Sequence, residues 1–417
     1  CYNNRMSPLF LLIIGFLCLQ YLVTLASNWL NLNAFSPLLP QEFLSCLSPK
    51  KYKKTLNYLQ DNTVFSLIQS GIFLILTISF LLLQGPNTLD QIARSFNYPE
   101  IITGLIFMGM LTGLSTLISI PFSLYHTFVI EQKFGFNQTT LTTFIIDLFK
   151  SLFLTVLLGA PIFALLQWFF LNFGSQAWII AWLTLTIIQL TLMYLAPILI
   201  MPIFNKFTPL AKGELSQAIN KFAQQQQFTL EGIYTMDGSK RSSKANAFFT
   251  GFGKYKRIVL FDTLITKHTT EELVSILAHE IGHYKKHHIL KQLLLSIAVS
   301  FITFFFLSRL INNQNVFTAF NVGQTSIYMS FFFIALLFSP FSELISIFVN
   351  YLSRKYEYQA DAYAVTTYKH SKDFTNALKK LSVDSLSNLI PHPIYVFLNY
   401  SHPPVLQRIK AINKLAP

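Results

Sequence analysis

Charged residues are scarce in this chain. They make up 12% of its 417 residues, whereas an ordinary soluble domain carries about 25%. Hydrophobic residues account for 52% of the chain and aromatic residues for 15%. This composition excludes a soluble globular protein and predicts an integral membrane protein.

Cysteine is almost absent, with only Cys1, Cys18 and Cys46 in the whole chain. No two of them form a CxxC pair, and Cys18 lies inside an apolar run. The cysteines therefore exclude both a disulfide framework and a thiolate metal site.

Acidic residues are fewer than basic ones, 18 against 31, which gives a formal net charge of +13. Such an excess can indicate nucleic-acid binding. Here, however, the basic residues cluster in loops between apolar runs, as they do in the cytoplasmic loops of membrane proteins. We therefore expect a lipid bilayer, and no nucleic acid, as a partner.

Long apolar runs predict seven membrane spans, because about 20 residues cross the hydrocarbon core. Lysines gather in the loops on one side of these spans, whereas residues 312–325 contain neither Lys nor Arg. The positive-inside rule therefore places the amino terminus outside and the carboxyl terminus in the cytoplasm. A eukaryotic source would imply an endoplasmic-reticulum-type membrane, and a bacterial source the inner membrane. The spans are predicted at 8–26, 64–83, 101–125, 148–171, 178–203, 289–310 and 326–349.

One long polar insertion, residues 204–288, separates the fifth and sixth spans and is the candidate catalytic domain. Its segment 256–261 is a short apolar run that predicts a strand. A helix is predicted to begin at Thr269 or Thr270, where acidic first-turn residues follow. We expect this helix to run on into the sixth span, which would fix the site near the membrane surface.

The predicted helix carries an HExxH motif at residues 279–283. Positions i and i+4 share one face of a helix, so His279 and His283 can bind one metal ion. Glu280 is then placed to take a proton from an activated water, as in zinc metalloproteases. The alternative is a polar patch on a surface helix that matches by accident.

Two histidines are too few for a catalytic zinc site, which usually has three protein ligands. His287 lies about 12 Å along the helix from His279 and cannot join the site unless the helix breaks. Glu357 and Asp361, past the seventh span, are again four residues apart. They can supply one ligand and a second carboxylate that orients a ligand histidine. Alternatively, both are solvated carboxylates that pair with Arg354 or Lys355.

Several segments together resemble the type I CAAX prenyl proteases, which are integral-membrane zinc endopeptidases. The likeness extends over most of the chain and departs from the animal members at Lys244, where they carry a histidine. The segments are Glu131 with 134–137, then 237–243, 246–249, 279–283, 357–361 and 400–404.

The resemblance implies a mostly α, multi-pass protein with seven transmembrane helices that form a barrel around a large chamber. A small α+β zinc-metalloprotease domain would lie on the cytoplasmic side. We divide the chain into spans 1 to 5 (1–203), the catalytic insertion (204–288), spans 6 and 7 (289–349) and a C-terminal segment that completes the site (350–417).

The resemblance also implies the roles of individual residues. His279, His283 and Glu357 would bind one Zn²⁺ per chain, Glu280 would be the general base, and Asp361 would support a ligand. Asn246 and Ala247 would lie on an edge strand that pairs with the substrate backbone. His402 and Arg408 would contact the substrate near the scissile carbonyl.

The function implied is hydrolysis of a peptide bond near the C-terminus of prenylated CAAX-type proteins or peptides, by a monomer. A second possibility is a broad-specificity quality-control metalloprotease that acts on non-prenylated membrane proteins. A third is a non-catalytic transporter or scaffold, against which the intact ligand set and base argue.

Overall fold

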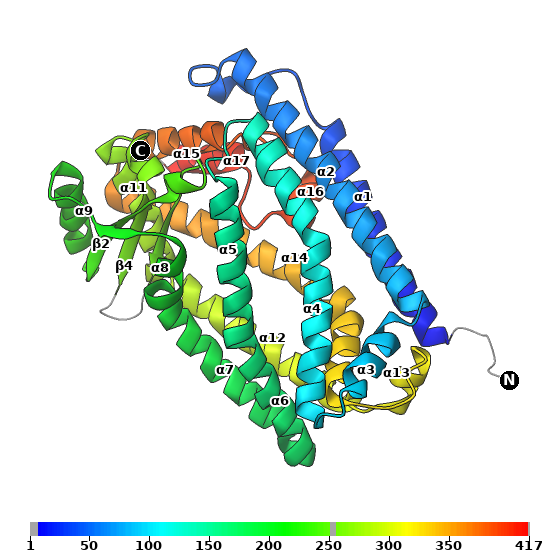
Figure 1. Ribbon diagram of the computed structural model, residues 1–417. Coiled ribbons are helices and arrows are strands. Elements are labelled where there is room, and N and C mark those ends of the chain that lie inside the picture. Colours follow the sequence, from blue (N-terminus) through cyan, green and yellow to red (C-terminus); the bar gives the residue numbers. More distant parts are fainter. Residues whose placement is uncertain (1–6, 251–255, 416–417) are drawn as a thin grey trace.

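The computed structural model describes residues 7–250 and 256–415. Within these ranges, seven helical segments are long and apolar enough to cross a membrane, which confirms the predicted number of spans. Figure 1 shows them surrounding a common interior. They are α1 (Pro8–Asn33), α2 (Pro49–Leu82), α4 with a π-helical extension η2 (Glu100–Glu131), α5 and α6 (Leu141–Asn172), the α7 segment (Gly174–Phe204), α12 (His288–Leu310) and α14 (Ile327–Tyr368).

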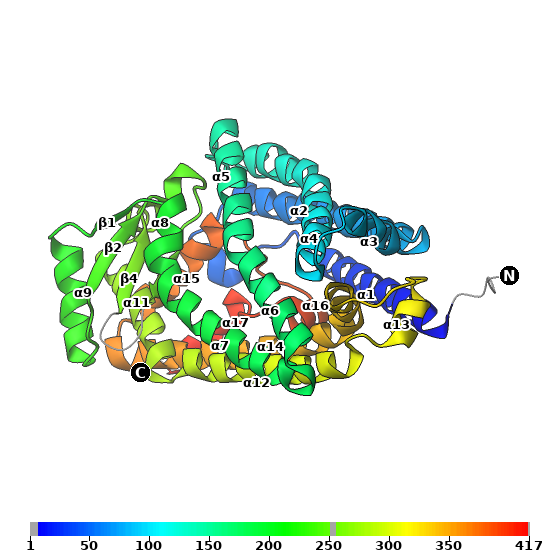
Figure 2. The ribbon, with the colours of Figure 1, turned by 60° about the horizontal axis from the view of Figure 1, so that its bottom comes forward.

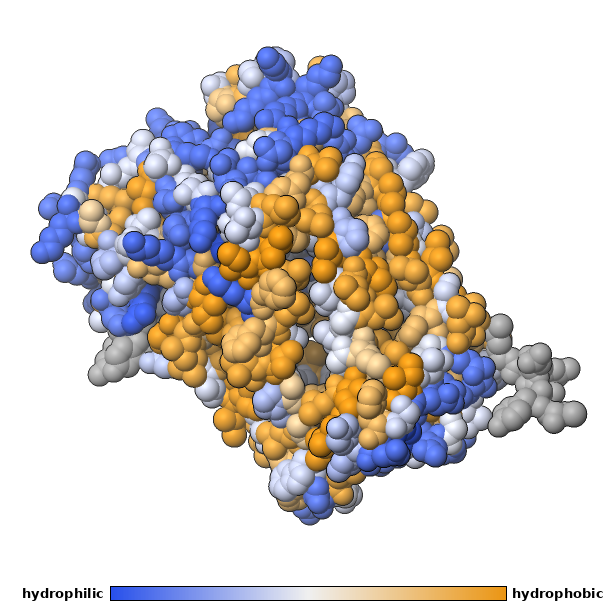
Figure 3. All heavy atoms as spheres, in the orientation of Figure 1, coloured by the Kyte–Doolittle hydropathy of each residue, from blue (hydrophilic) through white to orange (hydrophobic). Residues whose placement is uncertain are grey.

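The membrane helices form a hollow barrel rather than a packed bundle. In the most apolar window of each helix, only 0 to 17% of the residues are buried. The chain exposes 22320 Å² of surface, whereas a compact globular protein of its mass exposes about 16,000 Å². Gaps between the apolar helices in Figure 3 lead into the interior. The predicted barrel around a chamber is therefore confirmed.

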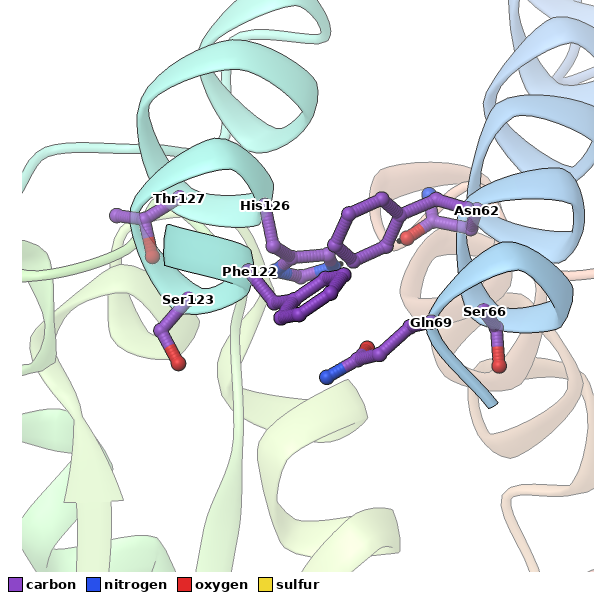
Figure 4. A pocket seen from close by; sticks show the side chains of 8 residues that line it. Asn62, Ser66, Gln69, Phe122, Ser123, His126 and Thr127 are labelled. Atoms are coloured by element: carbon purple, nitrogen blue, oxygen red, sulfur yellow. Dashed lines mark hydrogen bonds between the residues drawn. The ribbon is translucent and has the colours of Figure 1, made fainter. Parts of the chain in front are cut away.

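Polar side chains gather between two of the membrane-spanning helices. Between α2 and the end of α4 lies a pocket of about 380 Å³ (Figure 4). His126 is hydrogen-bonded there to Asn62 over 3.0 Å, and Ser66, Gln69 and Ser123 also line the pocket. Polar groups on membrane-spanning helices favour a cavity over the lipid-facing surface.

A packed apolar cluster closes the end of the barrel that lies away from the sheet. The short helices α3 (Gly85–Ser95) and α13 (Gln314–Ala319) fill that end. Phe107, Phe317 and Phe333 are fully buried in the cluster. The buried hydroxyl of Tyr328 donates to Asp90 over 2.5 Å, which joins α14 to α3.

The catalytic domain covers the opposite end of the barrel (Figure 2). Its four-stranded sheet has the order β1-β2-β4-β3, so β3 is an edge strand. The helices α9, α11 and α15 pack together beside this sheet around one hydrophobic core. The elements are β1 (Phe207–Pro209), α9 (Glu214–Gln225), β2 (Gly232–Met236), β3 (Ala247–Thr250), β4 (Arg257–Phe261), α10 (Asp262–Ile265), α11 (Thr270–Lys285), α15 (Ser371–Asp384), α16 (Pro393–Asn399) and α17 (Val405–Leu415).

The sequence predicted the start of α11 and the strand before it. Thr269 and Glu272 form a complete capping box, in which the side chain of each accepts the backbone N–H of the other. The predicted strand 256–261 is β4, which begins one residue later.

The prediction that the motif helix runs on into the sixth span was wrong. α11 ends at Lys285, and His287 adopts a left-handed conformation with φ of 58° before α12 begins at His288. This left-handed residue changes the direction of the chain, so that the His288 side chain contacts His283 of α11.

α14 is one continuous helix of 42 residues. It crosses the boundary that we drew between residues 349 and 350. Glu357 and Asp361 therefore stand on the same helix as the last membrane span, which fixes the distance between the site and the bilayer.

Candidate metal centre

Close packing of α11 against α14 brings the predicted ligands together. A Cβ at Gly282 would lie 3.1 Å from the backbone of Ala360, so the two helices touch at this glycine. His279 and Glu357 are both buried beside this contact, and His283 is half-buried. The two motifs, far apart in sequence, thus form a single site.

The three side chains present a ligand set for one cation. His279 Nε2 lies 3.2 Å from His283 Nε2. Glu357 places one carboxylate oxygen 3.5 Å from His279 and the other 3.2 Å from His283. Ligand atoms on a tetrahedral zinc with bonds of about 2.0–2.1 Å are about 3.4 Å apart. The buried Glu357 Oε2 also makes no hydrogen bond of normal geometry. The residues therefore fit zinc.

Asp361 contacts the first candidate ligand. Its carboxylate lies 2.8 Å from His279 Nδ1, so it fixes the ring with Nε2 toward the site. Burial lowers the pKa of His279, but hydrogen bonds with Asp361 and Glu357 outweigh burial and raise it to about 9. The site thus favours a positive charge between these side chains.

The second ligand has a support that the sequence reasoning missed. His283 Nδ1 lies 3.1 Å from His288 Nδ1, and His288 Nε2 lies 2.8 Å from Gln359 Oε1. If Nε2 of His283 holds the metal, its Nδ1–H donates to His288, which in turn donates to Gln359. The sequence gives no local signal for the break that turns His288 toward His283.

Glu280 is half-buried next to the ligands. Its carboxylate makes no hydrogen bond or ion pair with any residue that the structure describes, although it contributes to the charge environment of Arg408. Glu280 therefore remains available to accept a proton.

His402 and Arg408 both reach Glu357, but in different surroundings. His402 Nδ1 lies 3.0 Å from Glu357 Oε2 while its side chain is 65% exposed. The Arg408 side chain is only 12% exposed, and it donates to both oxygens of Asp361 over 2.6 and 2.8 Å. His402 is therefore open to a substrate, whereas Arg408 mainly contacts Asp361.

Neither Arg354 nor Lys355, the two partners in the alternative interpretation, forms an ion pair with Glu357 or Asp361 in the described part of the chain. The Arg354 guanidinium donates instead to the carbonyl groups of Val396 and Tyr400. These bonds hold the segment that leads to His402 against α14.

The strand β3 offers main-chain groups to a ligand. Ala247 pairs with Leu260 of β4, and its neighbour Asn246 accepts the N–H of Phe261 over 3.0 Å. Because the main-chain groups of an antiparallel strand alternate in direction, those of Ala247 face the free edge. The Ala247 N–H is held by the side chain of exposed Asn246 over 2.9 Å. A bound peptide could replace this local bond.

Lys244 joins β3 to the membrane helices. Its ammonium lies 2.8 Å from Glu131, 2.9 Å from the Tyr58 hydroxyl and 4.4 Å from the centre of the Phe136 ring. The segment that leads into β3 is therefore anchored to the end of the third membrane span.

Comparisons with known proteins agree with this arrangement. A family model described as CAAX prenyl protease N-terminal, five membrane helices, matches residues 28–206. The model for peptidase family M48 matches residues 209–416. The two together extend over nearly all of the chain.

Relatives and a solved structure match over similar lengths. The chain is 33% identical over 411 residues to the CAAX prenyl protease 1 homolog of Arabidopsis thaliana, with 96% of each chain covered. It is 37% identical over 325 residues to CAAX prenyl protease 1 of Saccharomyces cerevisiae, which covers 74% of this chain and 72% of the yeast protein. The crystal structure of S. mikatae Ste24p superposes with a TM-score of 0.93 at 31% identity, covering 98% of this chain and 100% of that one.

Proposed function

The chain belongs to peptidase family M48, and from this premise we propose that it hydrolyses a peptide bond near the C-terminus of prenylated CAAX-type proteins. It is a multi-pass membrane metalloprotease. The names of the matched relatives support the substrate class, since they are CAAX prenyl proteases from several eukaryotes.

The observation that carries the proposal is the set of three ligand atoms beside an unpaired glutamate. His279, His283 and Glu357 would hold one zinc ion per chain, with ligand atoms within 4.8 Å of one another. When bound there, zinc supplies Lewis-acid activation of a water molecule and of the scissile carbonyl. Glu280 accepts the proton of the water and then delivers it to the leaving amine.

Three further residues act around this exchange. His402, exposed on one side and close to Glu357, donates to the oxygen of the scissile carbonyl as negative charge develops on it. Asp361 keeps His279 in its ligand orientation, and Arg408 in turn holds Asp361 in place.

The substrate main chain would add a strand to the free edge of β3. Ala247 offers its N–H and carbonyl there, and Asn246 releases the Ala247 N–H when the peptide arrives. Pairing through main-chain groups reads the extended conformation of a peptide rather than its sequence.

A site at one end of a membrane barrel suits a lipidated substrate. A prenyl chain gains about 0.8 kcal/mol for each CH₂ that it buries in an apolar environment. A substrate tail held by the bilayer would therefore bring its peptide to the catalytic end of the chamber.

We place the catalytic domain on the cytoplasmic side, in an endoplasmic-reticulum-type membrane, and take the protein to act as a monomer. The lysines at the catalytic end of α2 support this orientation, since residues 50–54 contain four of them.

Removal and return of the metal tests the proposed chemistry. Purified protein treated with a chelator should lose cleavage of a farnesylated CAAX peptide, and one equivalent of zinc should restore it. Cleavage that survives removal of all bound metal would refute the assignment of the site.

A further inference from the structure

A second pocket lies where α11 ends and α12 begins, beside the C-terminal part of α14. Its volume is about 470 Å³, and no residue that lines it takes part in the proposed reaction. The break contributes one lysine, the first turns of α12 contribute another, and α14 contributes the remaining side chains. The lining residues are Lys286, Lys291, Gln359, Ala362, Tyr363 and Thr366.

The two lysines of this pocket have no carboxylate partner in the described parts of the chain. Both are exposed, and Lys291 also lies 5.7 Å from the centre of the Tyr356 ring. Gln359 accepts from His288 through Oε1, so its amide N–H groups remain free to donate. Two ammonium groups and an amide donor match the oxygens of a phosphate.

The pocket lies at the edge of the lipid-facing surface. Lys291 stands in the first turn of a membrane-spanning helix. Around it, the apolar residues Ile289, Leu290 and Leu294 are 42%, 51% and 58% exposed. A molecule with a phosphate in the pocket could therefore lay acyl chains against α12.

We propose that this pocket binds the phosphate head group of an anionic phospholipid. The two exposed lysines supply charge complementarity, and basic pockets beside membrane helices are a recognised setting for such head groups. The adjoining apolar surface of α12 favours a lipid over a soluble phosphate, which has no acyl chains to bury.

The bound head group is connected to the metal centre through hydrogen bonds. Gln359 lines the pocket and accepts from His288, and His288 pairs with the ligand His283 over 3.1 Å. A head group that fixes the Gln359 amide therefore steadies the ring of His283. This second effect rests on the proposed metal site, whereas binding of the lipid does not.

The test is native mass spectrometry of the full-length, zinc-loaded protein in detergent, titrated with phosphatidylserine or phosphatidylcholine. We expect one tightly bound phosphatidylserine and no matching site for phosphatidylcholine. The variant K286Q/K291Q should bind phosphatidylserine about thirtyfold more weakly, because each lysine contributes about one factor of five near an anionic surface.

The control variant K53Q/K54Q removes the same charge from the catalytic end of α2, where both lysines are exposed, and should leave this affinity within about twofold of wild type. Equal binding of both lipids, or equal loss in both variants, would overturn the proposal. Displacement of the lipid by millimolar inorganic phosphate would overturn the lipid as occupant. Zinc loss to a chelator, measured with and without phosphatidylserine, tests the link to His283 independently of proteolysis.

Discussion

At the scale of single residues, Glu280 and His279 stand next to each other in the chain but have different tasks. E280Q should reduce peptide hydrolysis by about 10² to 10⁴ while zinc stays bound, because it removes only the proton acceptor. H279A should lose the metal itself, because it removes one of three ligands. Zinc content by mass spectrometry and the rate of peptide cleavage measure both effects. Equal zinc loss in the two variants would refute the role of Glu280.

Arg408 offers a test between two roles. The resemblance implies contact with the substrate, whereas the side chain is 12% exposed and donates to both oxygens of Asp361. We expect R408K to weaken zinc retention by about 10- to 100-fold with KM unchanged, because lysine cannot form the two-pronged contact. The exposed K410Q on the same helix is the matched control. A raised KM with normal zinc retention would instead assign Arg408 to the substrate.

At the scale of elements, β3 is expected to bind peptide through its free edge. N246A should raise KM by up to about tenfold, the value of one hydrogen bond, because the Asn246 carboxamide, once it releases the Ala247 N–H, is free to bond the peptide. This bond positions the peptide rather than the reacting groups, so kcat should change less than KM. Steady-state kinetics on one peptide, with thermal unfolding as the check of the fold, measure the split. An unchanged KM would argue against strand pairing at this edge.

A buried histidine just before the N-cap of α11 makes stability depend on pH. Burial lowers the pKa of His268, although Glu272, 3.0 Å away, raises it, and Lys380 and Asp384 act in opposite directions. The unfolded chain, with a histidine pKa near 6.5, takes up a proton more readily than the folded one. The contribution of neutral His268 to stability is therefore fully present above about pH 6.5 and is lost as the pH falls below it.

The melting temperature should accordingly fall as the pH drops from about 7 to 5, and H268L should show a shallower fall. H370L is the control, because His370 is exposed and should leave the slope unchanged. Equal slopes for wild type and H268L would exclude His268 as the source.

The elements that were predictable from sequence carry local signals. The membrane spans have long apolar runs, and Thr269 with Glu272 gives α11 a capping box. The break at His287 has no glycine or proline to mark it, and the enrichment of histidine among left-handed non-glycine residues is too weak a signal to predict it. The continuous helix into the sixth span was therefore the natural but wrong prediction.

At the scale of the whole molecule, the site depends on contacts between distant segments. The HExxH motif predicted His279, His283 and Glu280 from their spacing alone. The link from Arg408 to Asp361 spans 47 residues, and the link from His288 to Gln359 spans 71. Such contacts depend on how α11, α14 and α17 pack, which no spacing in the sequence reveals.

The hollow barrel ties the chemistry to the membrane. Its far end is closed by the cluster around Phe107 and Phe333, and its other end is covered by the catalytic domain. A substrate with a prenyl tail suits this arrangement, because its tail prefers the lipid around the barrel and its peptide prefers the polar catalytic site.

The most direct test of this account is mass-spectrometric analysis of cleavage by the purified, detergent-solubilised protein. One CAAX peptide is supplied with and without a farnesyl group on its cysteine, and E280Q serves as the blank. We predict cleavage of the farnesylated peptide alone. Equal cleavage of both peptides would contradict the prenyl-protease assignment and indicate a broader membrane protease, and cleavage of neither by the zinc-loaded protein would contradict the proposed substrate class altogether.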